Sequence, residues 1–361
     1  MSDTDTRSSV SGVLLVGSVP LASTEEVFTK LSTSLAGRIT AIPDGETGAR
    51  YNYIVWEKQR FPREVLRHAI GGIDPPPGHS GQFALDDVKP TEYGTAAVES
   101  YQVFLQHREK NIIPAGVRFQ VCLPLPFAPI QGQIRPEFQA QIEPLYEQRM
   151  ADALREILEN IPPSDLVIQL DICLEILALE AEKGRLSDFF LPHFSRTVGI
   201  ESGLLDRIAR FIELIPRDVP LAFHFCYGDR DHKHFVEPED LALVVDFANR
   251  IRERIQRPVT WMHFPVPKNR NDVAYFEPLR RLELGNAAAA AAAAGTDAGA
   301  AETKLYLGLV HANDEDGTRE RVQAALSVVK RFGVATECGL GRTPVAELDS
   351  IFSISRDVTV L

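Results

Sequence analysis

The sequence has no dense run of lysine and arginine, no apolar stretch long enough to cross a bilayer, and four cysteines in all. Its net charge is −12, which disfavours nucleic acid and anionic membranes as partners. Residues 1–11 are polar and lack the basic and apolar regions of a secretory signal. The cysteines lie in or just after apolar runs, as reduced thiols inside cells do. We therefore expect a cytoplasmic protein that acts on a small molecule.

Eight short apolar runs, bounded by polar residues, glycine or proline, predict the strands of one sheet. Several are continuously apolar, which is typical of strands covered on both faces. Amphipathic patterns over 239–255 and 318–330 predict helices between strands. This alternation predicts a parallel sheet with helical crossovers, and eight strands predict that it closes into a barrel. The predicted strands are 12–19, 38–42, 117–123, 166–172, 221–225, 259–264, 305–310 and 333–336.

The predicted fold class is therefore α/β, with a single (β/α)8 TIM barrel over 12–361 as the catalytic domain and a disordered tail over 1–11. An open doubly wound sheet is the alternative, but it would gather polar residues at one crevice, whereas here they follow strand after strand. A long insertion over 51–94 follows the second strand, and insertions of this kind often cover a substrate. A low-complexity insertion over 286–303, with eight consecutive alanines, precedes the seventh strand.

One imidazole and two thiols at strand exits predict a zinc site. His224 and Cys226 are two residues apart at the end of the fifth strand, so their side chains point to the same side. Cys338 follows the eighth strand, and packing as a buried hydrophobe is its alternative role. His263 in the sixth strand is the best-placed fourth ligand, although a catalytic zinc needs only three protein ligands.

Other polar residues gather at the same predicted mouth of the barrel. Two glycines after the second strand allow a tight loop that brings carboxylates and a guanidinium together, with a surface Glu–Arg pair as the alternative. A carboxylate inside the apolar fourth strand needs a partner or a function, because burying an unpaired charge is costly. Histidines near the fifth and seventh strands are candidates for proton transfer, with structural roles as the alternative. These residues are Ser18, Asp44, Glu46, Arg50, Asp171, His234 and His311.

Four segments together resemble the C-terminal zinc barrel of the cobalamin-independent methionine synthase family. Segment 224–226 (HFC) matches the zinc-binding HxC of that family, and segment 338–340 (CGL) matches its final zinc cysteine. Segment 16–20 (VGSVP) is similar to the family's first-strand Gly-Ser segment, and segment 168–171 (IQLD) to its IQxD segment. The order and strand placement of the segments agree over most of the chain.

The resemblance implies a zinc-dependent enzyme that transfers a methyl group to or from a small thiol or thioether. It implies that Ser18 helps to hold an amino-acid-like substrate and that Asp171 holds the substrate amine. The family has a glutamate ligand on the sixth strand, where this chain has His263. A His₂Cys₂ set carries one negative charge fewer, which leaves zinc more electrophilic.

Two other functions remain open from the sequence. A zinc ion could instead activate water or a carbonyl in a lyase or hydrolase of a small, specialised metabolite. A barrel that binds a small ligand without turnover is the third. The sequence favours no particular oligomeric state, and it does not distinguish a folate methyl donor from others.

Overall fold

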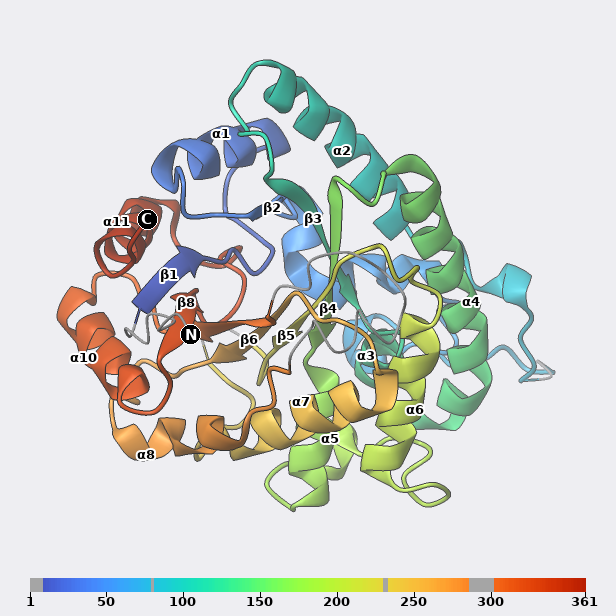
Figure 1. Ribbon diagram of the computed structural model, residues 1–361. Helices are drawn as coiled ribbons and strands as arrows, with labels where there is room; N and C mark the ends of the chain where they lie inside the picture. The colour runs from blue at the N-terminus through green and yellow to red at the C-terminus, as the bar shows by residue number, and fades with distance from the viewer. Residues whose placement is uncertain (1–8, 79–80, 230–232, 286–301) are drawn as a thin grey trace.

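Eight parallel strands form the centre of the computed structural model, which describes residues 9–78, 81–229, 233–285 and 302–361. The strand order is β1-β8-β7-β6-β5-β4-β3-β2, and each neighbouring pair is parallel. Helices surround the curled sheet (Figure 1), so the predicted (β/α)8 fold is confirmed. The strands are β1 Ser9–Val13, β2 Ala41–Pro43, β3 Arg118–Pro124, β4 Leu166–Ile172, β5 Leu221–Phe225, β6 Trp261–Pro265, β7 Lys304–Gly308 and β8 Arg331–Val334.

The helices begin and end close to where their sequence patterns place them. The pattern over 239–255 becomes α7, which begins three residues later than expected, and the pattern over 318–330 becomes α10, which begins three residues and ends four residues earlier than expected. No helix in the described ranges is long and apolar enough to span a bilayer. The helices are α1 Thr24–Ser34, α2 Tyr93–Glu109, α3 Phe127–Gln133, α4 Pro136–Asn160, α5 Leu174–Glu182, α6 Ile200–Ile212, α7 Ala242–Ile255, α8 Val273–Phe276, α10 Glu315–Leu326 and α11 Leu348–Asp357.

The first strand differs most from its prediction. Strands β4 and β5 have the predicted bounds, whereas β1 covers residues 9–13 instead of 12–19. Ser9 and Val10, expected in the tail, therefore pair with β8, and Ser11 forms an isolated bridge with Val360. The rest of the expected tail (residues 1–8) and most of the low-complexity insertion (286–301) lie outside the described residues.

The barrel is joined between β1 and β2 by single backbone hydrogen bonds. The Val13 N–H donates to the Arg38 carbonyl at 2.8 Å, and the Val19 N–H donates to the Gly45 carbonyl at 2.8 Å. These two strands are the ends of the sheet order, while every other strand has a paired neighbour on both sides. The β1–β2 seam, defined by these two hydrogen bonds, is thus the most weakly paired junction of the barrel.

Two glutamines inside the barrel bond to the backbone of residues just beyond the end of β1. The Gln120 amide donates to the Leu15 carbonyl at 2.9 Å, and the Gln169 amide donates to the Val16 carbonyl at 2.6 Å. Both glutamines are buried. Since buried backbone carbonyls need partners, these side chains replace the ladder that a longer first strand would have formed.

Strand register brings three polar side chains to one level of the barrel. Asp171 on β4 pairs with His224 on β5, and His224 pairs with His263 on β6. Asp171 and His224 lie next to the last residue of their strands, toward the end of the barrel where barrel enzymes bind substrates, and His263 lies in the middle of β6.

A buried arginine fixes the loops that follow β6 and β7. Arg321 on α10 is 1% exposed and donates to the carbonyls of Leu309 and Lys268 at 3.0 and 2.6 Å. It also donates to Asp314 Oδ2 at 2.7 Å. Because the buried Leu309 carbonyl and the partly buried Asp314 carboxylate would lose their donor, we expect Arg321→Met to lower the free energy of unfolding by about 3–5 kcal/mol in urea denaturation.

Arg319→Met is the matched control on the same helix. Arg319 pairs with Glu315 at 2.7 Å, and both side chains are half exposed. An exposed pair of this kind contributes little, so a change within about 0.5 kcal/mol is expected. Equal losses in the two variants would show that Arg321 does not fix these loops.

Candidate metal centre and substrate pocket

Three potential metal ligands converge at the carboxyl ends of β5 and β8. His224 is within β5, Cys226 follows that strand directly, and Cys338 lies four residues beyond β8. Their ligand atoms all lie within 4.8 Å of one another. The two cysteines are 112 residues apart in the sequence, so the barrel closure brings their thiols together as expected.

Two of the three separations among these atoms match the edges of a zinc tetrahedron. The sulfurs of Cys226 and Cys338 are 3.7 Å apart, and the Cys338 sulfur is 3.8 Å from His224 Nε2. Two sulfurs at about 2.3 Å from a tetrahedral zinc are about 3.8 Å apart, and a sulfur and an imidazole nitrogen are about 3.6 Å apart. The donor set therefore fits zinc, and a tetrahedron built on it keeps one vertex free.

Hydrogen bonding and burial favour the neutral form of both thiols. The pKa of Cys226 is raised well above its usual range by its hydrogen bond with Cys173 and by burial. The pKa of Cys338 is raised likewise, by its hydrogen bond with Cys226 and by burial. The Gly228 N–H opposes this by donating to the Cys226 sulfur at 3.2 Å. Binding of a cation at this site would be coupled to proton release, because the thiolate is the ligand.

His263, the expected fourth ligand, lies behind His224 and not beside the thiols. Its Nδ1 is 2.7 Å from His224 Nδ1, and its Nε2 is 3.0 Å from the Thr336 carbonyl oxygen. Burial lowers the pKa of His263 to about 3 and holds the pKa of His224 well below its usual range, so both rings are neutral. The structure thus brings together three of the four expected ligands.

Ser18 contacts the loop that carries Cys338. The Leu340 N–H donates to the Ser18 carbonyl at 2.6 Å, and the Gly341 N–H donates to Ser18 Oγ at 3.1 Å. A Cβ atom at Gly339 would lie 2.4 Å from Ser18 Oγ, so only glycine permits this close approach. Ser18 therefore orients the loop of Cys338, and its expected contact with a substrate stays a prediction.

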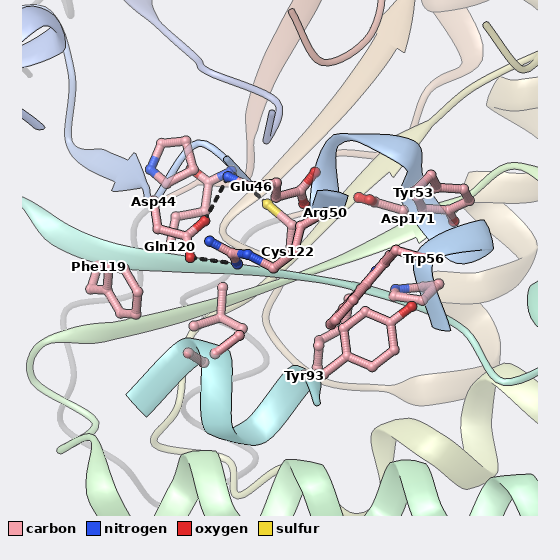
Figure 2. Close-up of a pocket in the computed structure, with 16 residues that line it drawn as sticks. Asp44, Glu46, Arg50, Tyr53, Trp56, Tyr93, Phe119, Gln120, Cys122 and Asp171 are labelled. Carbon is pink, nitrogen blue, oxygen red and sulfur yellow. Dashed lines mark hydrogen bonds and ion pairs between the residues drawn. The ribbon is translucent and has the colours of Figure 1, made fainter. Parts of the chain in front are cut away.

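A second group of expected residues lines a small pocket at the ends of β2, β3 and β4 (Figure 2). The cavity has a volume of about 40 Å³. The insertion over 51–94 supplies aromatic side chains to its wall, in line with the expected covering role. The structure brings together Asp44, Glu46, Arg50 and Asp171 in this lining, with Tyr53, Trp56 and Tyr93 from the insertion.

Asp44 anchors the loop that follows β2. Its Oδ2 accepts from Arg50 Nη1 and from Ser100 Oγ, each at 2.7 Å, and its Oδ1 accepts from the Glu46 N–H at 2.9 Å. Glu46 has a φ of 46°, which non-glycine residues rarely adopt. The ion pair that forms is thus Arg50 with Asp44, and it holds the turn that directs Glu46 into the pocket (Figure 2).

Two carboxyl groups of the pocket resist ionisation. Burial and the charge of Asp44 raise the pKa of Glu46 to about 8. Burial and the charge of Glu46 raise the pKa of Asp171 well above its usual range, although the Gln169 amide donates to Asp171 Oδ1 at 2.9 Å. Neither carboxyl forms an ion pair within the described part of the chain. A bound cation would lower both pKa values, so the pair forms a site for positive charge.

Tyr53 is a candidate binding residue that the sequence reasoning missed. Its φ of 46° and ψ of −122° are unusual for a bulky residue. Its hydroxyl is buried and has no hydrogen-bond partner among the described residues. Burial and the charge of Asp171 raise its pKa well above the usual range, so the hydroxyl remains a donor. Nothing in the local sequence marks Tyr53 except its place in the insertion.

A larger cavity, of about 920 Å³, opens on the other side of the thiols. It is lined by Cys226 and Cys338, by His234 and His311, and by Glu337. The expected proton-transfer histidines therefore lie beside the candidate metal centre, whereas Asp171 lines the smaller pocket. Glu337 was not expected, although a charged residue next to a cysteine at a strand exit is the signal that marks it.

The two histidines flank Glu337 and differ in protonation. His234 Nε2 is 3.3 Å from Glu337 Oε1, and His311 Nδ1 is 3.9 Å from Glu337 Oε2. Burial lowers the pKa of His234, but hydrogen bonds with Glu337 and Glu237 outweigh it and raise the pKa to about 9. Burial lowers the pKa of His311 to about 3, and its Nε2 is hydrogen bonded to the Val266 carbonyl at 3.0 Å. His234 thus carries a proton at neutral pH, while His311 offers a lone pair at Nδ1.

No protein-family model matches this chain, and no curated protein sequence matches it. Solved structures with a similar fold include a methyltransferase from Methanosarcina mazei, with a TM-score of 0.50 and 12% identity over 99% of this chain and 95% of that chain. A candidate vitamin-B12-independent methionine synthase from Listeria monocytogenes has a TM-score of 0.49 and 14% identity over 94% of this chain and 87% of that chain. Identities this low show a shared fold and nothing finer.

Proposed function

We propose that the protein is a zinc-dependent methyltransferase that transfers a methyl group to or from the sulfur of a small thiol or thioether. The single observation that carries the proposal is the convergence of one imidazole and two thiols, with two of their three separations equal to edges of a zinc tetrahedron. The shared fold with the M. mazei methyltransferase supports the reaction class.

His224, Cys226 and Cys338 would hold the ion. A bound zinc supplies a Lewis acid that lowers the pKa of a substrate thiol and so generates a thiolate nucleophile. The chain's own residues contribute the rest of the site: Ser18 orients the Cys338 loop, and the buried thiols give up their protons to the solvent-open cavity beside them.

The small pocket would bind the cationic end of the substrate. Glu46 and Asp171 provide two carboxyl groups that form no ion pair with any described residue, and a primary ammonium group would satisfy both. The unpartnered hydroxyl of Tyr53 would donate to a substrate oxygen. Asp44 and Arg50 would act at a distance from the substrate by holding the loop of Glu46. These residues select an amine-bearing thiol.

The large cavity would receive the second reactant. Its volume of about 920 Å³ suits a molecule much larger than an amino acid. His234 would give a proton to the methyl carrier or its leaving group, because its pKa of about 9 keeps it charged at neutral pH. Glu337 orients His234, and His311 Nδ1 accepts from a donor on the reactant.

The test combines metal analysis with a methyl-transfer assay. We expect one zinc per chain in the purified protein, and methylation of homocysteine in the presence of methyltetrahydrofolate or another methyl donor. A thiol of the same length without the amino group should react poorly, because Glu46 and Asp171 then lack their cation. Protein without stoichiometric zinc would overturn the proposal. Zinc without any methylated product would favour a lyase or hydrolase.

A further inference from the structure

His263 is a buried residue that the proposed function leaves without a role. It lies in the middle of β6, is fully buried, and pairs in register with His224 on β5. Its Nδ1 lies 2.7 Å from His224 Nδ1, and its Nε2 lies 3.0 Å from the Thr336 carbonyl oxygen. Because Thr336 precedes Cys338 by two residues, this one ring contacts both segments that carry the candidate ligands.

The hydrogen bonds determine where the ring protons are. A carbonyl oxygen can only accept, so His263 carries its proton on Nε2 and presents a lone pair at Nδ1. The short contact between the two Nδ1 atoms then requires the proton of His224 to be on its Nδ1. This leaves a lone pair on His224 Nε2, the atom that lies 3.8 Å from the Cys338 sulfur.

We propose that His263 is a positioning residue that holds His224 in the Nδ1–H tautomer and directs its Nε2 toward the two thiols. The inference rests on the proposed metal centre and deepens it, because it replaces the fourth-ligand role expected from the sequence. His263 accepts a hydrogen bond from the ligand and does not touch the ion.

Two features favour positioning over ligation. Both ring nitrogens of His263 are already hydrogen bonded, so ligation would break one of these bonds in the barrel interior. A histidine that binds a metal almost always donates its other N–H to an acceptor, which fixes the ring and its tautomer. Here that acceptor is an imidazole, which is fixed in turn by the backbone carbonyl of Thr336, two residues beyond β8.

The same ring also ties the Cys338 segment to β5. The Thr336 carbonyl accepts from His263, and the Thr336 hydroxyl donates to the Cys338 carbonyl at 2.8 Å. A continuous chain of hydrogen bonds therefore runs from His224 through His263 and Thr336 to the backbone of Cys338. This chain sets the separation of the ligands before any ion binds.

Three substitutions separate the two hydrogen bonds of His263. His263→Asn keeps an oxygen near the position of Nδ1, so it can still accept from His224. His263→Gln places its amide near the position of Nε2, so it can contact only Thr336. His263→Phe fills the ring volume and makes neither bond. Met262→Leu, at the neighbouring buried position of β6, is the control for disturbance of the strand.

The first measurement is zinc affinity by chelator competition, with cobalt absorption spectra to report the ligand set. We expect His263→Phe and His263→Gln to weaken zinc binding by about 10–100-fold, the usual effect of losing the partner of a ligating histidine. His263→Asn should retain most of the affinity, and Met262→Leu all of it. The cobalt bands should be the same in every variant, because the ligands do not change.

The second measurement does not need the metal. Imidazole ¹⁵N shifts of the metal-free protein should show His224 as the Nδ1–H tautomer in the wild type and in His263→Asn, and as the Nε2–H tautomer in His263→Phe. An unchanged tautomer in His263→Phe would overturn the inference, as would loss of a nitrogen ligand from the cobalt spectrum in any His263 variant. A tautomer shift in a protein that binds no zinc would defeat the proposed function alone.

Discussion

Cys338→Ser should leave the protein without stoichiometric zinc and reduce methyl transfer by at least about a thousandfold. The Cys338 sulfur is 3.7 Å from the Cys226 sulfur and 3.8 Å from His224 Nε2, so it forms two edges of the proposed tetrahedron. A serine hydroxyl is a far weaker zinc ligand than a thiolate at neutral pH. Zinc is measured by elemental analysis after dialysis, and activity by product formation.

Cys122→Ser is the matched control for metal content. Cys122 lines the small pocket and its thiol contacts the Val16 carbonyl at 3.3 Å, away from the three ligands. It should retain one zinc per chain. Retention of full zinc by Cys338→Ser, or its equal loss from both variants, would refute the ligand assignment.

Asp171→Asn should weaken binding of an amine-bearing thiol by about 150- to 4000-fold while the zinc content is unchanged. The amide has the shape of the carboxyl group but cannot pair with an ammonium ion, and losing one partner of a buried charge pair costs about 3–5 kcal/mol. The readout is the Kd or KM for the thiol, compared with that for a thiol lacking the amino group. Binding of the thiol that lacks the amino group should hardly change.

The same substitution should stabilise the free protein in a pH-dependent way. The pKa of Asp171 is higher in the folded protein than in the unfolded chain, where it is about 3.9. The folded state therefore binds the extra proton, and wild-type stability falls as pH rises above about 4. Asp171→Asn removes this penalty, so its melting temperature should exceed that of the wild type at pH 8, and the difference should shrink toward pH 4.

Glu175→Gln is the control that separates the effect of a buried carboxyl on protein stability from its effect on thiol binding. Glu175 lies on α5 and is 1% exposed, and burial raises its pKa to about 8, but it does not line the small pocket. Glu175→Gln should stabilise the protein, as Asp171→Asn does, without changing the KM for the amine-bearing thiol. If Glu175→Gln weakened thiol binding as much as Asp171→Asn, the loss could not be assigned to a lost ammonium contact.

Much of the fold follows from the sequence because the strands are buried on both faces. The largely apolar run of β4, which is buried at every residue, has the predicted bounds. The first strand was placed wrongly because residues 14–19 are equally apolar. Their carbonyls bond to Gln120 and Gln169, partners more than a hundred residues away that local pattern does not reveal.

The candidate site was predictable where strand geometry determines it and unpredictable where ring orientation or backbone strain does. The strand order brings the ends of β5 and β8, and with them Cys226 and the loop of Cys338, to the same rim of the barrel. His263 lies at the expected level of the sheet, but both of its ring nitrogens are used in hydrogen bonds and neither is free to bind a metal ion. A rare backbone conformation places Tyr53 in the pocket, and a tyrosine in the sequence does not predict that conformation.

An ion held by Cys226 and Cys338 would also act as a staple across the barrel. It would close a loop of 112 residues, and cross-links that close long loops reduce the entropy of the unfolded chain most. The β1–β2 seam, with its two isolated hydrogen bonds, lies outside that loop and is the natural place for the barrel to unzip. On heating, the strands would separate first at the β1–β2 seam. The half of the barrel between β5 and β8 would stay folded until the ion dissociated. The thermal stability of this half of the barrel would therefore depend directly on how tightly the metal is retained.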